Sequence, residues 1–404
     1  MKDTTLTKIY YTSPTEYENV YRERFNSPLS FHLNIDIKQY RRRKSYPAFF
    51  YYSKDCALYT EKIYSEYKHF LSLVGNTLPV VLRQFTLLSI LDEVKATNDI
   101  EGINSTRKEI RDILDGNAGK TDRLESIVNK YRSLLDNREI PFSTCRDLRA
   151  FYDEFAHNEI IKENSAHALD GDIFRKDPVD IESPTGKIIH RGVFPESKII
   201  ENLETALEIL HSDEYPLLVR LGLFHYLFAY IHPFYDGNGR TDRFITSYFL
   251  KQDFHTLLAL RLSVYIKKNR KTYYELFKEN DSEINRGDLT PFVIGFLKMI
   301  LGTIEDTINL LNRKSEQIEK YREKIYSLDL SDPLLNDIYF ILLQASLFYG
   351  DGIHISQLVD ITGKTRKTIQ KRIDAIPKEN LIIEKKQKTY YYRLNLRSAP
   401  WMLS

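Results

Sequence analysis

The sequence predicts a mainly α-helical protein with one short β-hairpin in its central part and a small helix-turn-helix domain at the C-terminus. Three observations lead to this prediction. Apolar residues recur at every third or fourth position over most of the chain, as they do on one face of an α-helix. A Pro-Thr-Gly turn signal at 184–186 precedes a short stretch typical of a strand. Residues 331–404 contain two short helical patterns joined by Gly363, and two strand-like runs follow them.

The size and composition of the chain are those of an ordinary globular protein. Its 404 residues allow two or three domains, and 42% hydrophobic residues suffice for a sizeable core. A net charge of +2 excludes a chain-wide attraction to nucleic acid or anionic membranes. Cys56 and Cys145 lack the spacing of a metal knuckle or redox pair, which favours reduced thiols. Residues 1–16 are polar and the apolar stretch 217–231 is interrupted, so we expect a cytoplasmic protein without membrane contact.

The first part of the chain predicts helices from about residue 61 onward. Apolar positions at helical spacing run from Glu61 to Val94, with a break at Gly75-Asn76 and a second helix beginning near Pro79. A short helix is expected near 105–114, with Ser105 as its N-cap. Residues 1–60 show no clear periodicity. We assign residues 1–118 to an N-terminal helical region.

The central and C-terminal parts divide into three further segments. We assign residues 119–303 to a helical core, 304–330 to an exposed helical spacer and 331–404 to a small domain. In the core, Lys187–Arg191 follows the turn signal and predicts a strand, with a simple loop as the alternative. In the small domain we expect helices over 333–348 and 357–362 (capped by Ser356), a third helix to about Ile376, and a hairpin from 381–383 and 389–394. Two helices around a tight turn, followed by a hairpin, are typical of a winged helix.

The most informative stretch is residues 231–243, which read IHPFYDGNGRTDR. A buried helix precedes it, and Pro233 ends that helix, so His232 stands where a loop begins. A second helix begins near Arg240. Two glycines in the loop let backbone N–H groups converge, and the helix N-terminus adds partial positive charge. Together they predict an anion-binding loop suited to phosphate.

Side chains in this stretch fit phosphate chemistry. Arg240 and Arg243 lie three residues apart and both reach phosphate oxygens from one helix face. Asp236 offers a hard oxygen ligand for Mg²⁺. His232 is a base near neutral pH, and Asn238 can stabilise charge on a transferring phosphate. A packed turn or an ordinary loop explains any one of these elements, but their ordered combination favours the functional interpretation.

Residues 232–243 resemble the core motif of the Fic family, H-P-F-x-[D/E]-G-N-G-R-x-x-R, at every fixed position. The resemblance extends over roughly residues 80 to 300 and implies a Fic-type helical core. It implies transfer of AMP from ATP to a Tyr, Ser or Thr hydroxyl of a target protein or of the chain itself. By this resemblance His232 is the base, Asp236 binds Mg²⁺, Gly237, Asn238, Gly239 and Arg240 hold the α- and β-phosphates, and Arg243 holds the γ-phosphate. Related Doc kinases typically carry Lys in place of Gly239, which favours AMP transfer over phosphorylation.

Two further regions are similar to parts of the same family. The strand residues Lys187, Ile188, Ile189 and His190 resemble the flap, a hairpin that aligns the target by strand pairing. Residues 269–277 resemble the segment that lines the adenine pocket, with Tyr273 and Tyr274 as the candidate contacts. Two tyrosines on a helix also fit a core position, and this alternative stays open.

An inhibitory segment is expected upstream of the core motif. Residues 97–102, TNDIEG, resemble the family's inhibitory motif, S/T-x-x-x-E-[G/N], through Thr97, Glu101 and Gly102. Glu101 can pair with Arg243 through a charge-assisted contact and withdraw it from the γ-phosphate. The alternative is an ordinary helix end capped by Gly102. In some relatives the equivalent glutamate supports AMP removal, so Glu101 is also a candidate base for the reverse reaction.

Two stretches of the sequence are rich in Lys and Arg, and each fits more than one class of binding partner. Residues 364–388 carry more Lys and Arg than Asp and Glu, which fits a DNA-contacting helix and wing or, equally, a protein-docking or homodimer module. Residues 41–44, RRRK, fit a solvated charge run, with a nucleic-acid or target contact as the alternative. The competing functions are therefore an enzyme that removes AMP, a transferase of another nucleotide, and a DNA-binding regulator whose core senses nucleotide.

Overall fold

A computed structural model describes residues 4–116, 123–136, 138–182, 186–328, 331–348, 352–386 and 389–398. The expected turn residues Pro184 and Thr185 lie outside this part of the chain. The chain folds into two units: Met1–Tyr67 with Ser89–Ile304, and Lys68–Leu88 with Glu305–Ser404. Each unit draws on two stretches of chain, whereas the four segments expected from the sequence divide it linearly. Those segment boundaries stay predictions.

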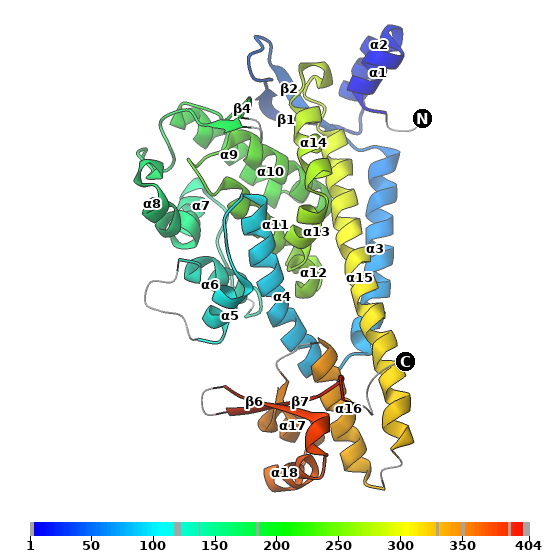
Figure 1. Cartoon of the computed structure of the whole chain (residues 1–404). Helices are drawn as coiled ribbons and strands as arrows, with labels where there is room; N and C mark the ends of the chain where they lie inside the picture. Colours follow the sequence, from blue (N-terminus) through cyan, green and yellow to red (C-terminus); the bar gives the residue numbers. More distant parts are fainter. Residues whose placement is uncertain are drawn as a thin grey trace. The chain divides into compact units, whose positions relative to one another are not determined.

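The first unit is mainly helical, which confirms the predicted fold class (Figure 1). Helices α3, α4 and α15 continue into the second unit. The helices that contribute to the first unit are α1 (Leu6–Thr12), α2 (Pro14–Phe25), α3 (Lys54–Gly75), α4 (Pro79–Ile100), α5 (Arg107–Leu114), α6 (Glu125–Ser133), α7 (Cys145–Tyr152), α8 (Asn158–Glu163), α9 (Glu196–His211), α10 (Leu217–Ile231), α11 (Asn238–Asp253), α12 (Thr256–Ala259), α13 (Leu262–Lys268), α14 (Arg270–Asn280) and α15 (Thr290–Ser327).

Helix α10 forms the centre of the first unit. Almost all of its residues are buried, because Leu, Phe, Val and Tyr side chains occur on every side of it. It packs against α9 and α11, the elements before and after it in the chain. Gly222 lets α15 approach closely, since a Cβ at that position would lie 3.2 Å from the ring of Phe296. This packing holds both ends of α10 in place.

Two antiparallel hairpins lie in the first unit. Strand β1 (Ser30–Ile37) pairs with β2 (Tyr46–Tyr51), from Ser30↔Tyr51 to Ile37↔Tyr46. The sequence did not lead us to expect this hairpin. Strand β3 (Asp180–Glu182) pairs with β4 (Ile188–Arg191), which confirms the predicted central hairpin.

The helix boundaries around α4 mostly follow the sequence signals. The predicted break between α3 and α4 is confirmed, but α4 continues past the expected end to Ile100. Thr97 therefore lies on the last turn of α4, and Glu101 directly follows it. The predicted N-cap of α5 was wrong by one residue, because Thr106 and Glu109 form the capping box.

The second unit contains the helices and the hairpin that the sequence predicts for its C-terminal part. Helices α17 and α18 meet at Gly363, whose φ of +65° favours glycine. The N-cap of α17 is His354 and not Ser356. The elements are α16 (Pro333–Phe348), β5 (Ile353–His354), α17 (Ile355–Thr362), α18 (Arg366–Asp374), β6 (Leu381–Lys386) and β7 (Thr389–Leu394), with sheet order β5-β7-β6. Membership of the winged-helix class stays a prediction.

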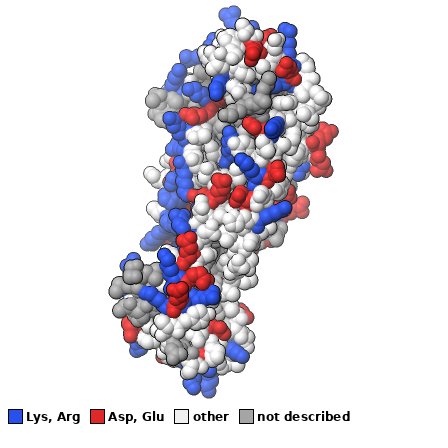
Figure 2. Space-filling view, turned by 90° about the vertical axis from the view of Figure 1, so that its right-hand side faces the viewer, with Lys and Arg blue, Asp and Glu red and all other residues white. Residues whose placement is uncertain are grey.

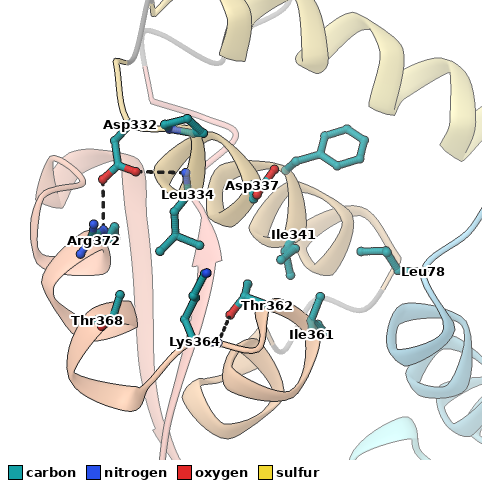
Figure 3. Close-up of a pocket in the computed structure, with 12 residues that line it drawn as sticks. Leu78, Asp332, Leu334, Asp337, Ile341, Ile361, Thr362, Lys364, Thr368 and Arg372 are labelled. Atoms are coloured by element: carbon teal, nitrogen blue, oxygen red, sulfur yellow. Dashed lines mark hydrogen bonds and ion pairs between the residues drawn. The ribbon is translucent and has the colours of Figure 1, made fainter.

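A salt bridge connects α18 to the start of α16. Asp332 accepts a hydrogen bond from the backbone N–H of Leu334 at 3.0 Å and pairs with Arg372 at 3.0 Å (Figure 3). Beside this pair lies a pocket of about 760 Å³, with Ile341 and Lys364 among its lining residues. Arg372 is thus neutralised by Asp332, which leaves the outward face of α18 to its other basic residues.

Charges of both signs are interspersed on the face of the molecule drawn in Figure 2, as a net charge of +2 suggests. In the described ranges, none of the helices combines the length and the apolar character needed to span a membrane.

Candidate active site

The loop between α10 and α11 begins with His232 in an unusual backbone conformation. His232 is the C-cap of α10 and has φ 53° and ψ 63°, a left-handed conformation that costs a non-glycine residue about 1 kcal/mol. Pro233 cannot continue the helix. At the other end of the loop, Gly237 has φ +79° and precedes the first turn of α11. The first N–H groups of α11 have no partner within the helix, so this turn is suited to an anion.

Asn238 holds this loop closed. Its side-chain oxygen accepts a hydrogen bond from the N–H of Phe234 at 2.9 Å, and its side-chain nitrogen donates to the carbonyl of Phe234 at 2.8 Å. The side chain is buried and uses both ends of its amide in this way. The side chain of Asn238 is thus engaged within the loop, and its backbone N–H is the group left for an anion, so its assignment to phosphate binding stays a prediction.

The side chain of His232 is held as a neutral base. Burial, followed by the nearby charges of His190 and Arg175, lowers its pKa to about 3, although part of the residue reaches the surface. Nδ1 lies 3.3 Å from the carbonyl oxygen of Ala229. A carbonyl only accepts, so this contact places the hydrogen on Nδ1 and leaves Nε2 free to take a proton.

Arg175 organises the loop, and the sequence did not reveal it. Its guanidinium is fully buried and donates to the carbonyl oxygens of His232 at 2.8 and 2.9 Å, Val193 at 2.9 Å and Asp177 at 2.7 Å. Burial lowers its pKa to about 10. Arg175 thereby connects the end of α10 to the segments on both sides of the β3–β4 hairpin.

Arg243 is fully buried and contacts α4. Its Nε donates to the Thr97 hydroxyl at 2.8 Å, and its Nη2 donates to the Thr97 carbonyl at 3.1 Å and the Glu101 carboxylate at 2.7 Å. Burial opposes the charged guanidinium, but the carboxylate of Glu101 outweighs it and raises the pKa of Arg243. The structure thus brings Thr97, Glu101 and Arg243 together. Gly102 follows with φ +75° and ends this segment.

Glu101 also lies against the start of α11. A Cβ added to Gly239 would come within 2.2 Å of its Oε1 and 3.0 Å of Nη1 of Arg243. Glycine at this position therefore permits the carboxylate to occupy the space beside the first turn of α11. The same space is next to the N–H groups that the sequence assigns to phosphate.

Glu93 anchors α4 one turn further back, and the sequence did not indicate it. It precedes Thr97 by four residues, and both of its oxygens accept the backbone N–H of Ser263 at 3.0 Å. Full burial raises the pKa of Glu93 to about 7, although these hydrogen bonds work in the opposite direction. Contacts at successive turns thus hold one face of α4 and its end against the core, and they come from Glu93, Thr97 and Glu101.

Arg240 lies in a buried ion pair. Its Nη1 donates to Glu159 of α8 at 2.6 Å, and both side chains are almost completely buried. The charge of Arg240 is therefore compensated inside the protein by a residue that lies 81 positions earlier in the chain. The sequence contains no local signal for Glu159 as its partner.

Asp236 fits a magnesium ligand. Its Oδ1 accepts from the N–H of Gly237 at 2.5 Å, while Oδ2 lies 3.7 Å from Nδ1 of His167 and the side chain is 43% exposed. Mg²⁺ in phosphate-transfer sites takes one or two carboxylates, with substrate phosphates and water as the other ligands. A single exposed carboxylate beside the loop meets that requirement. Within the described residues, groups of three or more His, Cys, Asp or Glu that could hold a metal are absent.

The flap residues do not all face outward. Lys187 and Ile189 are exposed and Ile188 is partly buried, as a target-docking strand requires. His190 is buried, with Nε2 2.7 Å from the Tyr230 carbonyl oxygen. The side chain of His190 thus attaches the flap to α10, and its assignment to the target-docking strand stays a prediction.

The two candidate adenine contacts, Tyr273 and Tyr274, differ in burial. Tyr273 is buried in a cluster with Ile100 and Leu262, and its hydroxyl lies 2.7 Å from Nε2 of His225. Tyr273 therefore lies in the core, which favours the core alternative, and its assignment to the adenine pocket stays a prediction. Tyr274 is 41% exposed and contacts the guanidinium of Arg270, so it stays a candidate.

Comparisons with known proteins find relatives of part of this chain. A family model described as Fic/DOC family matches residues 151–250. A protein adenylyltransferase Fic of Nematostella vectensis is 36% identical over 86 residues, 21% of this chain and 17% of the relative. Another, of Drosophila ananassae, is 28% identical over 240 residues, 57% of this chain and 43% of the relative. The chain thus spans less than half the length of these curated relatives.

A solved structure shares the fold. The crystal structure of a Fic family protein from Desulfovibrio desulfuricans G20 has a TM-score of 0.52 and 19% identity, and the match covers 86% of this chain and 97% of that one. The residues that match the family model include His232, the loop with Asn238 and the start of α11 with Arg243. The chain therefore contains a Fic domain.

Proposed function

We propose that this protein transfers AMP from ATP to a Tyr, Ser or Thr hydroxyl of a target protein or of itself, and that Glu101 inhibits the transfer. The observation that carries the proposal is the neutral base His232 beside an anion-binding helix start whose arginine, Arg243, is paired with Glu101 at 2.7 Å. The relatives named protein adenylyltransferase Fic support ATP as the nucleotide.

The proposed reaction follows from the positions of these groups. Nε2 of His232 takes the proton from the target hydroxyl, whose oxygen then forms a bond to the α-phosphorus of ATP. The bond from that phosphorus to the bridging oxygen breaks, and pyrophosphate leaves with the electron pair. The N–H groups at the start of α11 stabilise the negative charge on the phosphate oxygens. Mg²⁺ held by Asp236 would neutralise phosphate charge when bound.

Inhibition follows from competition for one arginine. As long as Glu101 pairs with Arg243, the guanidinium is not available to a γ-phosphate, and a carboxylate beside the helix start repels phosphate. Removal of the carboxylate is therefore expected to permit productive ATP binding. The same carboxylate could act as a base for water in AMP removal, which is the second activity to test at this site.

Incubation with α-labelled ATP and Mg²⁺ tests the proposal. We expect strong label on the Glu101→Gly protein, weak label on the wild type, and none on Glu101→Gly/His232→Ala. Glu139→Gly removes an exposed loop carboxylate and should behave as wild type. Absence of label from all four proteins would contradict transfer of AMP from ATP to the chain itself. Parallel reactions with α-labelled UTP and GTP, and release of AMP from a modified target, test the alternative activities.

The second unit supports a second candidate function, binding of duplex DNA. Arg366, Lys367 and Lys371 are exposed on α18, and no described residue forms an ion pair with them. Three cations on one short helix fit contacts to phosphates, with α17 and α18 in the helix-turn-helix order. A protein-docking or homodimer role of the same surface is the alternative.

Salt-dependent DNA binding by the full chain tests this function. Residues 68–88 belong to the second unit, so a cut at residue 304 would not isolate it. We expect binding at low salt that weakens as salt rises, and Lys367→Ala/Lys371→Ala should lower the salt slope by about two. Lys108→Ala/Arg132→Ala, at exposed positions of α5 and α6, is the matched control. No binding at low salt would contradict the DNA function, and sedimentation of the same proteins would reveal a dimer.

A further inference from the structure

A basic loop connects β1 to β2. It spans residues 38–45, and four consecutive cations in it are exposed: Arg41, Arg42, Arg43 and Lys44. A tight turn presents them, in which the N–H of Arg42 donates to the carbonyl of Gln39 at 3.0 Å and Arg41 has φ +63°. Left-handed backbone at a residue other than glycine has a cost, and here it directs a run of cations toward solvent.

The basic loop is anchored beside the flap and the end of α10. The N–H of Lys38 donates to the hydroxyl of Tyr230 at 2.9 Å, and Tyr230 precedes His232 by two residues. The guanidinium of Arg191, the last residue of β4, lies 5.4 Å from the ring centre of Tyr40. Figure 1 shows β1, β2 and β4 in the same part of the first unit. The loop therefore borders the place where a target hydroxyl must arrive.

Some of the charges around the basic loop are already paired. Asp180 of β3 binds Arg191 through two hydrogen bonds of 2.5 and 2.7 Å. Glu283 lies 3.5 Å from Arg42. Arg43 and Lys44 have no ion pair with any described residue. These two exposed cations thus belong to the loop whose Tyr40 contacts Arg191 at the end of the flap.

We propose that the target segment docked at the flap is acidic next to its acceptor hydroxyl, and that the basic loop binds its carboxylates. A segment that pairs with β4 covers the half-exposed side chain of Ile189 and reaches the loop where Tyr40 packs on Arg191. Arg43 and Lys44 then supply the unpaired positive charge. This inference rests on the proposed function, since it names the class of protein segment that the same site modifies.

The surroundings of the loop favour an acidic peptide over a nucleic acid. Asp36 lies at the end of β1 and accepts a hydrogen bond from Ser45, and Asp180 lies beside Arg191. A continuous phosphate chain laid along the loop would pass these carboxylates and be repelled. A peptide with a few carboxylates can meet Arg43 and Lys44 and avoid both acids.

Fluorescence anisotropy with the full chain tests this inference without nucleotide. The probe is a fluorescein-labelled peptide with one Tyr flanked by Glu, and its control has Gln at every Glu. We expect the Glu peptide to bind roughly tenfold more tightly than the Gln peptide at low salt, and less so as salt rises. Arg43→Glu/Lys44→Glu should weaken binding of the Glu peptide by roughly tenfold. Arg132→Glu/Lys320→Glu changes the net charge equally, on α6 and α15, and should leave binding unchanged.

The outcomes separate this inference from the proposed function. Equal affinity for the two peptides, no binding of either, or equal effects of the two double variants would overturn the acidic-segment proposal. Tighter binding of a fluorescein-labelled RNA oligonucleotide, lost in Arg43→Glu/Lys44→Glu, would overturn it in favour of nucleic acid. The α-labelled ATP assay on these proteins reports transfer independently, because peptide binding is measured without ATP.

Discussion

Replacement of Gly239 by Ala should break the contact between Glu101 and Arg243. The new Cβ would meet Oε1 of Glu101 at 2.2 Å, whereas ordinary contact begins at 3.4 Å, so the carboxylate must move by about 1.2 Å. That shift breaks its 2.7 Å hydrogen bond to Arg243. The side chain of Glu101 is 30% exposed, so this hydrogen bond contributes to the free energy of unfolding near the low end for a charged hydrogen bond, about 2 kcal/mol. Alanine is a better helix former than glycine and stabilises the helix by about 1 kcal/mol. The free energy of unfolding should therefore fall by about 1 kcal/mol in total.

A double-mutant cycle isolates this contact. In a Glu101→Gly background only Nη1 of Arg243, at 3.0 Å, lies close to the new Cβ, and it needs to move by only a few tenths of an ångström. Gly239→Ala should then stabilise the protein by up to about 1 kcal/mol, a coupling of about 2 kcal/mol. Urea unfolding followed by circular dichroism measures the four proteins. Gly75→Ala is the matched control, because a Cβ there meets nothing within 4 Å and its effect should be the same in both backgrounds. Equal effects of Gly239→Ala with and without Glu101 would refute the reasoning.

Three further predictions concern the loop and α4. Asn238→Ala leaves the Phe234 backbone without its two partners and should lower the free energy of unfolding by about 2–3 kcal/mol in urea titrations; an unchanged midpoint would contradict the closed loop. Glu93 has its pKa raised from 4.5 to about 7, so the folded state favours its protonated form. Relative to Glu93→Gln, the wild type should lose up to about 3 kcal/mol of stability as pH rises from 4.5 through 7, and a pH-independent difference would argue against burial as the cause. Arg175→Met should raise the pKa of His232 in an NMR titration, while Arg175→Lys, which keeps the charge, should raise it less; equal pKa values in both variants would exclude the charge effect.

The sequence predicted the loop between α10 and α11 because the signals there are local. Pro233 must end a helix, and the apolar residues before it must be buried wherever the helix packs. The contact between Glu101 and Arg243 was also predictable, although 142 residues separate them, because both belong to motifs that resemble those of one family.

The β1–β2 hairpin is marked in the sequence by a short alternating pattern. Leu33, Ile35 and Ile37 alternate with polar residues, which is the period of a strand with one buried face. The aromatic residues around this short stretch obscured the alternation. A hairpin assignment would have placed residues 41–44 at its tip, but not beside the flap.

The partners of the buried charged side chains could not be predicted from the sequence. Arg175 binds backbone carbonyls, which every residue has, so no residue type marks its partners. Arg240 and Glu159 meet across 81 residues through the packing of α8 on the core. Tyr273 and Tyr274 are adjacent and chemically alike, and the side of α14 that faces His225 decides which one is buried.

The two hydrogen bonds between Asn238 and Phe234 have a thermodynamic consequence for any anion bound at the start of α11. A flexible loop loses conformational entropy when it closes on a ligand, about 1–2 kcal/mol for each residue that becomes ordered. Here that entropy is lost when the protein folds, because the amide of Asn238 already fixes the chain from Phe234 onward. The intrinsic affinity of the site for an anion is therefore not reduced by loop ordering, and preorganisation of this kind favours binding.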